Sequence, residues 1–340
     1  MQRRDFTVNA MAYNAEYGLV DPYGGKNDLK NKIIRCVGNP DTRFNEDALR
    51  ILRALRFASV YGFSIEENTS KSIFKNADLL KNIATERVIS EFLKLICGKD
   101  AVKILDAYRE TIAVIIPEIT VMFNFNQNNI HHSYDLWQHT LTALGTIEPN
   151  SILRMTMLLH DIGKPSVKTT DNSGQSHFQG HQLESKKIAD KILHRLRLPS
   201  DFINKTLLLI EYHDVRFNGS KKLMKKVMNV LGTDLTKQLL EVEYADISAQ
   251  SEYQREEKLG YLETAKTHLN EIIKDNECFK LSQLDINGKD VLNLGVKEGR
   301  DVGNILNYLL MLVVDANVPN KKSMLISKAK EYIYGNQINN

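Results

Sequence analysis

The stretch RFNEDALRILRALRF, residues 43–57, decides the fold because its apolar residues recur at helical spacing. Those apolar residues are Ala48, Leu49, Leu52, Leu55 and Phe57. The pattern predicts an amphipathic helix that Gly62 ends. Asp47 and Arg50 are three residues apart, so we expect them to share one helix face and to offer a paired acceptor and donor to a base. Arg53 and Arg56 extend a basic stripe that suits a nucleic-acid backbone.

Helical patterns continue through most of the sequence after this stretch. We expect helices near residues 69–80, 85–97 and 99–108, a helical block over 131–275, and last helices over 301–315 and 321–334. The Asn-rich residues 124–129 predict a loop and a domain boundary. Strand-like alternation is confined to residues 5–36, where Phe6, Val8 and Ala10 are followed by Leu19 and Val20. The fold class is therefore mainly α, with a small N-terminal β part.

The composition is ordinary for a soluble protein, with 42% apolar and 26% charged residues and a net charge of +3. So small a net charge does not by itself indicate nucleic-acid binding. The cysteines Cys36, Cys97 and Cys278 have no pairable spacing, which predicts reduced thiols and a cytoplasmic protein. No apolar run is long enough to cross a bilayer, so we expect no membrane association through a spanning segment.

Three blocks in a fixed order carry a family resemblance: residues 3–10, residues 21–25 and residues 43–57. Together they resemble the class II tRNA nucleotidyltransferase (CCA-adding enzyme) and bacterial poly(A) polymerase family. The resemblance extends from residue 2 to about residue 334. It implies addition of CCA to the 3′ end of tRNA from CTP and ATP, with Mg²⁺ as cofactor. Whether such a chain adds CCA, CC or A alone stays open, as does its oligomeric state.

The resemblance also implies roles for residues near the first helix. Those matching Asp47 and Arg50 hydrogen-bond the incoming cytosine or adenine, and those matching Arg4 and Asn9 contact the triphosphate and ribose. Arg53 belongs to the same nucleotide-binding surface. Without the family, these charges equally fit a solvated helix face with salt bridges.

Two further blocks match parts of the family that move or brace the nucleotide site. The residues matching Asp21, Gly24 and Gly25 lie in a flexible hinge. Residues 86–91 match a helix-stabilising motif, so Glu86, Arg87 and Glu91 are expected to brace the nucleotide-reading helix.

One feature of the family is missing from the sequence. In the family a Gly-Ser loop and an Asp-x-Asp pair hold two catalytic Mg²⁺ ions, and no such pair follows a Gly-Ser loop in residues 1–340. We therefore expect no catalytic residue for nucleotidyl transfer here. A truncated reading frame is expected in preference to a separate polypeptide that supplies the missing half.

A second signature is a set of histidines and aspartates spread over residues 131–250. His160 and Asp161 are followed by Gly163 and Lys164, and the segment resembles the HD-domain phosphohydrolases. The metal ligands that this implies are His139, His160, Asp161 and Asp246. Imidazole and carboxylate groups suit Mn²⁺, Ni²⁺, Fe²⁺, Zn²⁺ or Mg²⁺, and separated helices can bring them together in a bundle core.

Three more residues belong to this candidate metal site. His181 and His213 are placed to bring in a second metal, although a structural role for them stays equally open, and Lys164 can orient a phosphate. The metal and the substrate of such a site are not fixed by the sequence.

The expected domains are the head remnant (1–36), the neck (37–125), the HD domain (130–255) and a C-terminal body (256–340). In the body, Lys289 and Arg300 lie among glycines, where they either contact tRNA or flank a packing turn. Two alternatives to CCA addition stay open. The chain can be a metal-dependent phosphohydrolase acting on 2′,3′-cyclic or monoester phosphates, or a tRNA-binding module without catalysis.

Overall fold

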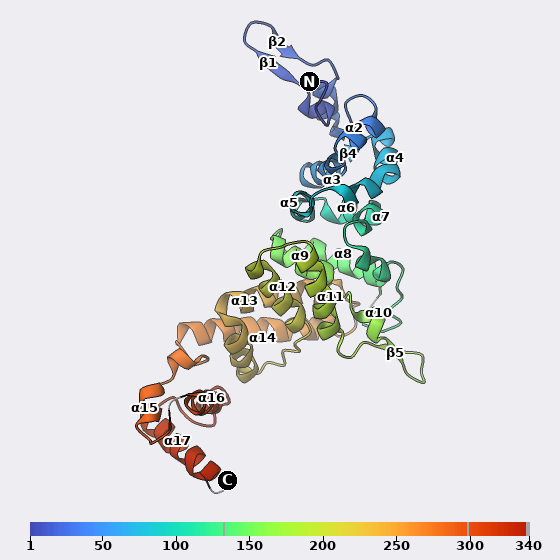
Figure 1. Cartoon of the computed structure of the whole chain (residues 1–340). Helices are drawn as coiled ribbons and strands as arrows, with labels where there is room; N and C mark the ends of the chain where they lie inside the picture. Colours follow the sequence, from blue (N-terminus) through green and yellow to red (C-terminus); the bar gives the residue numbers. More distant parts are fainter. Residues whose placement is uncertain (132, 298, 338–340) are drawn as a thin grey trace. The chain divides into compact units, whose positions relative to one another are not determined.

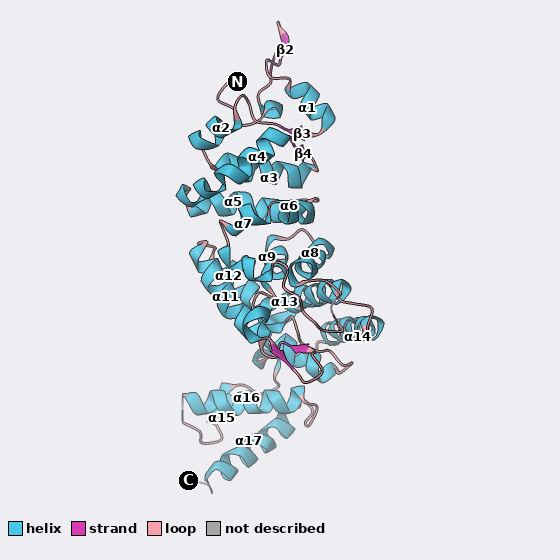
Figure 2. Ribbon diagram, turned by 90° about the vertical axis from the view of Figure 1, so that its right-hand side faces the viewer, coloured by secondary structure: helices cyan, strands magenta, loops and turns pink. Residues whose placement is uncertain are grey.

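The computed structural model describes residues 1–131, 133–297 and 299–337 of the chain. Helices make up most of these residues, and the strands form only short pairs (Figure 2). The predicted fold class, mainly α with a small β part near the start, is confirmed. Among the described helices, none is both long and apolar enough to cross a lipid bilayer.

The chain forms two compact units (Figure 1). The first contains Met1–Asp214 and Glu241–Arg255, and the second contains Val215–Leu240 and Glu256–Asn340. Residues 215–240, which we expected inside a continuous 130–255 domain, thus cluster with the C-terminal residues. The finer division into four domains stays a prediction.

The first unit begins with short elements. They are the 3-10 helix η1 (Thr7–Asn9), strands β1 (Ala12–Asn14) and β2 (Gly18–Val20), helix α1 (Gly25–Asn31) and strand β3 (Ile33–Ile34). β1 and β2 form an antiparallel hairpin in which Ala12 faces Val20. β3 pairs in parallel with β4 (Ser64–Ile65).

The predicted strand over Phe6–Ala10 is wrong, because η1 occupies its centre. Local side-chain hydrogen bonds favour the tight turn. The Asp5 carboxylate accepts from the Phe6 N–H at 2.9 Å, and the Thr7 hydroxyl donates to Asp28 at 2.7 Å. Such bonds offer the backbone an alternative to a sheet ladder.

Helix α3 (Leu49–Tyr61) is the predicted amphipathic helix, and it ends at Gly62, whose φ of 68° lies in the left-handed region. It packs against α5 (Thr85–Ile96). Fully buried side chains fill the contact, among them Leu52, Leu55 and Phe92. Burial of each such side chain stabilises the folded state by about 1.5–3 kcal/mol. The apolar stripe therefore determines which face of α3 is exposed to solvent.

The prediction that Asp47 and Arg50 share one helix face is wrong. Helix α2 (Pro40–Glu46) ends before Asp47, whose φ of −153° and ψ of 101° are extended. The Asp47 carboxylate instead accepts a hydrogen bond from the Leu49 N–H at 3.1 Å, and so caps the start of α3.

The rest of the first unit is a series of helices with one hairpin that we did not predict, β5 (Thr169–Thr170) with β6 (Ser176–His177). The other elements are α4 (Glu67–Asn76), η2 (Ala77–Asn82), α6 (Ala101–Ala107), α7 (Arg109–Ala113), η3 (Pro117–Met122), α8 (Leu136–Thr146), α9 (Ser151–Leu159), α10 (Lys164–Val167), α11 (His181–Arg195) and α12 (Ser200–Tyr212). Four of these helices form a packed group (Figure 1). α8 packs against α9, α9 against α12, and α12 against α11. Trp137 of α8 is fully buried, and its indole N–H donates to Asp106 of α6 at 3.1 Å.

The second unit is helical throughout its described part. It contains the first part of α13 (Lys221–Ala249), α14 (Arg255–Lys274), η4 (Leu281–Gln283), α15 (Gly288–Leu292), α16 (Arg300–Val314) and α17 (Lys322–Gln337). The expected last helices, 301–315 and 321–334, are thereby confirmed within a few residues. α13 is interrupted at Gly232, and its residues from Glu241 onward belong to the first unit.

Gly98 marks the closest approach of backbones in the neck, and it yields a stability prediction. A Cβ atom at Gly98 would lie 2.1 Å from the Ser59 Oγ and 2.6 Å from the Ser59 carbonyl carbon. We expect Gly98→Ala to destabilise the first unit by about 1–3 kcal/mol, because the backbone segments at Gly98 and Ser59 would have to move apart to accommodate the methyl group. Calorimetric unfolding measures the change. The control is Gly260→Ala in α14, where no atom lies within 4 Å, and where the substitution should be neutral or stabilise by up to about 1 kcal/mol. A Gly98→Ala protein as stable as wild type would contradict this packing.

Candidate functional site

Asp47 lies between α2 and α3 with its carboxylate held from two sides. Its Oδ1 accepts from the Leu49 N–H, and its Oδ2 accepts from Arg87 of α5 at 2.9 Å. One third of the Asp47 side chain is exposed (33%), so the carboxylate can still meet a ligand. The carboxylate is therefore oriented before any ligand arrives.

Arg50, the second residue of α3, has its guanidinium fixed by three oxygens. It pairs with Glu46 at 2.8 Å and donates to the Arg43 carbonyl at 3.0 Å and the Arg3 carbonyl at 2.9 Å. The last bond holds the segment that contains Arg4 against the start of α3. Arg4 itself is exposed, as a phosphate contact requires.

Asp5 joins two predicted nucleotide-binding residues, although the sequence did not mark it. This carboxylate is only 7% exposed. It accepts from Arg53 at 2.7 Å and from the Asn9 side chain at 3.3 Å. Its place directly after Arg4 in the first matching block was the available signal. The structure thus brings Arg4, Asn9, Arg50 and Arg53 to one region around the start of α3.

Helix α5 braces this region with two of the three expected residues. Arg87 bonds Asp47, and Glu91 pairs with Arg56 of α3 at 3.2 Å. Glu86 instead pairs with Arg197 at 2.6 Å, where both side chains are mostly exposed. The bracing prediction therefore holds for Arg87 and Glu91 only.

The expected hinge residues have a visible local role. Asp21 caps the start of α1, since its carboxylate accepts from the N–H groups of Gly25 at 2.7 Å and Lys26 at 2.9 Å. These backbone bonds, the one from Lys26 first, hold the pKa of Asp21 below its usual value. Gly24 has a φ of 72°, and a Cβ on Gly25 would lie 2.1 Å from the Thr7 carbonyl oxygen. A hinge motion at these residues stays a prediction.

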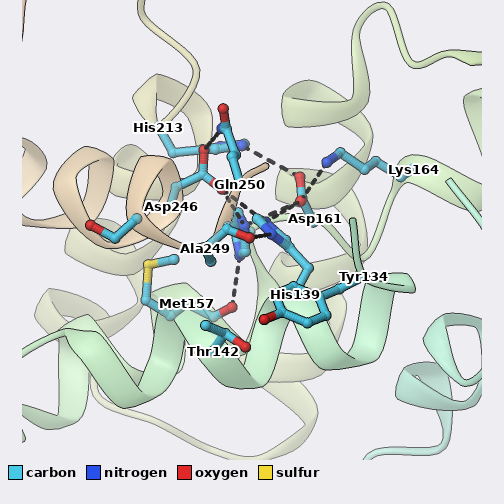
Figure 3. A network of polar contacts seen from close by, with 12 residues as sticks. Tyr134, His139, Thr142, Met157, Asp161, Lys164, His213, Asp246, Ala249 and Gln250 are labelled. Atoms are coloured by element: carbon cyan, nitrogen blue, oxygen red, sulfur yellow. Dashed lines mark hydrogen bonds and ion pairs between the residues drawn. The ribbon is translucent and has the colours of Figure 1, made fainter. Parts of the chain in front are cut away.

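The histidine cluster is assembled from the ends and inner faces of several helices of the first unit. His139 lies on α8, His160 and Asp161 directly follow α9, and Asp246 lies on α13. In Figure 3 the side chains of His139, Asp161 and Asp246 point toward one another. One ligand atom from each of the four lies within 4.8 Å of all the others.

This first cluster is closely spaced, with three buried members and a half-buried Asp246. The His139 Nε2 lies 2.9 Å from the Asp246 Oδ1 and 3.4 Å from the Asp161 Oδ2. The His160 Nε2 lies 3.2 Å from the Asp161 Oδ2 and 3.4 Å from the Asp246 Oδ1. Two imidazole nitrogens and two carboxylates facing one point form a donor set that fits a divalent transition metal.

A second cluster shares Asp161 through its other oxygen. The Asp161 Oδ1 lies 3.2 Å from the His181 Nε2 and 3.6 Å from the His213 Nε2. His181 begins α11 and His213 directly follows α12. The geometry of Asp161 therefore fits a bridge between two neighbouring ions.

Each of the four imidazoles has its other nitrogen on a main-chain carbonyl. The Nδ1 contacts are His139 to Ala249 at 3.3 Å, His160 to Met157 at 2.7 Å, His181 to Phe178 at 2.9 Å and His213 to Ile210 at 2.6 Å. Because a carbonyl only accepts, Nδ1 must carry the proton, and in the neutral ring Nε2 carries the lone pair. The Nε2 atoms of His181 and His213 are 3.1 Å apart, so two neutral rings would point lone pairs at each other unless a cation lies between them.

The charges of the cluster are strongly coupled. Burial is the largest single influence on the pKa of His160 and lowers it, but the charges of Asp161 and Asp246 and the hydrogen bonds to them together raise this pKa to about 10. Burial raises the pKa of Asp161, yet His160 and Lys164 hold it well below its usual value. Lys164 Nζ lies 2.6 Å from the Asp161 Oδ2 and 3.1 Å from the Gln127 side-chain oxygen. Without metal, Lys164 and protons on His139 and His160 thus supply the positive charge that the carboxylates require.

Lys289 and Arg300, the expected tRNA contacts of the C-terminal body, lie in the second unit. Both side chains are exposed, Lys289 on α15 and Arg300 at the start of α16. Asn287 caps α15 by accepting from the Lys289 N–H at 2.9 Å. Their contact with RNA stays a prediction.

Three family models match parts of the chain. Residues 1–35 match the poly A polymerase head domain, and residues 62–123 match the probable RNA and SrmB-binding site of polymerase A. Residues 181–329 match a putative domain 2 of tRNA nucleotidyltransferases.

Curated relatives agree with these models. The chain is 29% identical to the CCA-adding enzyme of Ligilactobacillus salivarius, over 98% of this chain and 71% of the relative. It is 33% identical to the A-adding tRNA nucleotidyltransferase of Deinococcus radiodurans, over 64% of this chain and 52% of that protein. The multifunctional CCA protein of Neisseria meningitidis is also 33% identical, over 68% of this chain and 56% of that protein. The matched part therefore spans between 52% and 71% of the length of these relatives.

Solved structures share the fold. The CCA-adding enzyme of Bacillus stearothermophilus in complex with CTP superposes with a TM-score of 0.70 at 24% identity, over 100% of this chain and 75% of that one. The Thermotoga maritima CCA-adding enzyme complexed with tRNA gives a TM-score of 0.55 at 21% identity, over 97% of this chain and 73% of that one.

The Asp5–Arg53 pair yields a prediction for this region. Asp5→Asn keeps the size of the side chain but leaves Arg53 without its carboxylate, so we expect a loss of about 1–3 kcal/mol in unfolding free energy. The value stays below that of a fully buried pair because one third of Arg53 is exposed (33%). The control is Asp78→Asn, whose partner Lys81 is mostly exposed, and which should cost almost nothing. Equal stabilities of the two variants in thermal unfolding would contradict a structural role for Asp5.

Proposed function

The chain belongs to the tRNA nucleotidyltransferase (CCA-adding enzyme) family, and on this basis we propose that it selects CTP and ATP for addition to the 3′ end of tRNA. The family depends on divalent metal. The sequence contains no Asp-x-Asp pair that would hold Mg²⁺ for nucleotidyl transfer, so the proposal concerns nucleotide choice and RNA binding by the residues present. Three unpaired cysteines support a cytoplasmic location.

The observation that supports this proposal is that Asp47 and Arg50, although not on one helix face, are each held in a fixed orientation at the start of α3. One offers carboxylate oxygens and the other guanidinium N–H groups, and each is held by partners that leave it little freedom. A base edge that needs one acceptor and one donor can bind both at once. Protein groups held in this way select a base without a nucleic-acid template.

We expect loss of either partner to reduce base selectivity. A well-placed pair of hydrogen bonds discriminates between bases by about 1–3 kcal/mol. Wild type should therefore prefer CTP and ATP over GTP and UTP by at least about fivefold, and Asp47→Ala or Arg50→Ala should abolish the preference. Equilibrium binding of each nucleotide to the full chain measures it.

The control for this experiment is Asp78→Ala, which removes an exposed carboxylate from η2. Its nucleotide preference should equal that of wild type. The assignment of Asp47 and Arg50 is contradicted if both variants retain the wild-type preference.

A second function, metal-dependent hydrolysis of phosphate esters, is supported by one specific observation, the two clusters that share Asp161. We propose that His139, His160, Asp161 and Asp246 hold one divalent ion, and that Asp161, His181 and His213 hold another. Bound there, such ions supply Lewis-acid activation of water and phosphate. Lys164 is then placed to neutralise phosphate charge, and cyclic 2′,3′-phosphates or phosphomonoesters at RNA ends are the proposed substrates.

The clusters predict a defined metal stoichiometry. Wild type should bind two Mn²⁺ or Ni²⁺ ions per chain, His181→Ala should retain one, and Asp161→Ala should lose both, because its two oxygens face different clusters. Since metal-free His160 has a pKa of about 10, binding at neutral pH must displace protons. Affinity should therefore rise with pH by about tenfold per unit for each proton displaced.

Metal analysis after dialysis and titration calorimetry in several buffers test this stoichiometry. The control is His194→Ala, which removes an exposed histidine of α11 and should bind two ions. A wild-type chain that takes up no ion, or an Asp161→Ala chain that binds as wild type does, would show that the cluster is structural only.

A further inference from the structure

The carboxyl-terminal half of α3 carries a stack of aromatic rings that the nucleotide-reading role does not use. Phe57 and Tyr61 are stacked, with centroids 5.8 Å apart and planes 19° from parallel. Tyr61 also meets Phe63, at 5.9 Å. The stack begins inside the protein, where Phe57 meets the fully buried Phe6 edge to face at 5.8 Å, and it ends at Tyr61, which is 53% exposed.

We propose that the exposed Tyr61 ring, backed by Phe57, is a platform on which a base of single-stranded RNA stacks. The proposal rests on the proposed function, since it names where the RNA that receives nucleotides would lie. Single-stranded RNA binds proteins largely through aromatic rings that continue its own base stacking. A single exposed tyrosine is ordinary, but one that ends a stack anchored in the core is held in a fixed orientation.

Two arginines hold the stack in place. The Arg56 guanidinium carbon lies 4.2 Å from the centroid of Phe57, and that of Arg53 lies 5.3 Å from it. Each arginine is also fixed by a carboxylate, Arg56 by Glu91 and Arg53 by Asp5. Because both charges are compensated, the platform should attract RNA by stacking more than by net charge.

The platform lies in register with the nucleotide-reading residues. Arg50, Arg53, Phe57 and Tyr61 follow at spacings of three, four and four, which places them on one stripe of α3. Arg50 and Tyr61 are 11 residues apart, and at about 1.5 Å per residue this is about 16 Å of helix. Stacked nucleotides advance by about 3.4 Å each, so a strand that ends at Arg50 would place a base at Tyr61 about five nucleotides upstream.

A phosphate contact is available beside the platform. Lys99 is exposed, and its side chain lies against Gly62, the residue after Tyr61. A lysine that touches a phosphate gives binding a dependence on salt, whereas a stacked ring does not. The two contributions can therefore be separated by experiment.

The test measures binding of the full chain to a labelled single-stranded oligoribonucleotide by fluorescence anisotropy over a range of salt concentrations. Tyr61→Ala should weaken binding by about tenfold, as loss of one stacked base does, with the salt dependence unchanged. Tyr61→Phe keeps the ring and should bind as wild type does. Lys99→Ala should instead reduce the salt dependence by about one ion. The matched control is Tyr17→Ala, which removes a tyrosine that is 74% exposed in the β1–β2 turn.

The outcomes separate this inference from the proposed function. The platform is supported if Tyr61→Ala binds the oligoribonucleotide more weakly than wild type while Tyr61→Phe and Tyr17→Ala bind it as wild type does. Wild-type affinity of Tyr61→Ala, in a chain that still binds RNA and prefers CTP and ATP, overturns the platform and leaves the proposed function standing. A chain that binds no RNA overturns both. Circular dichroism spectra that match wild type exclude unfolding as the cause of a loss.

Discussion

The buried carboxylate of Asp161 is the group on which the arrangement of the first unit depends. It is only 1% exposed, and an isolated charge at that depth would be very unfavourable. Four imidazoles and Lys164 surround it, from α8, from the end of α9, from α10, and from the neighbourhoods of α11 and α12. The packing of these helices therefore cannot vary freely, because each must deliver a nitrogen to the same carboxylate. That constraint explains why so polar a cluster lies inside a helical core.

The neck uses charge in a different way. There, three arginines of α3 are each paired with a carboxylate: Arg50 with Glu46, Arg53 with Asp5 and Arg56 with Glu91. The Asp5 and Glu91 carboxylates are buried, whereas Glu46 is exposed, so the three pairs differ in what they contribute to stability. Their effect is to fix the directions of the guanidinium groups along one helix. A surface that discriminates between bases needs such fixed directions more than it needs net positive charge.

The sequence predicted most of what depends on periodicity and residue type. The amphipathic α3 and its end at Gly62 follow from apolar spacing. His139, His160, Asp161 and Asp246, which the structure brings together, were implied by the resemblance of their segment to HD-domain phosphohydrolases. Features decided by single hydrogen bonds were not predictable. Asp47 leaves the helix because its carboxylate caps Leu49, and the segment around Phe6 turns because Asp5 binds its backbone. The β5–β6 hairpin is closed by a local turn at Asp171 and Gly174, a signal that the sequence analysis missed. The grouping of residues 215–240 with the C-terminal residues depends on contacts far apart in the sequence.

Three of the cluster's histidines share a local arrangement with a further consequence. His160, His181 and His213 each bond the carbonyl of the residue three positions earlier. The direction of each ring is thus encoded within four consecutive residues and needs no particular neighbouring side chain. Substitutions elsewhere can accumulate without turning the rings, so the cluster can persist while the surrounding sequence diverges. In distant proteins, a histidine in such a turn would remain recognisable from backbone geometry after sequence similarity has been lost.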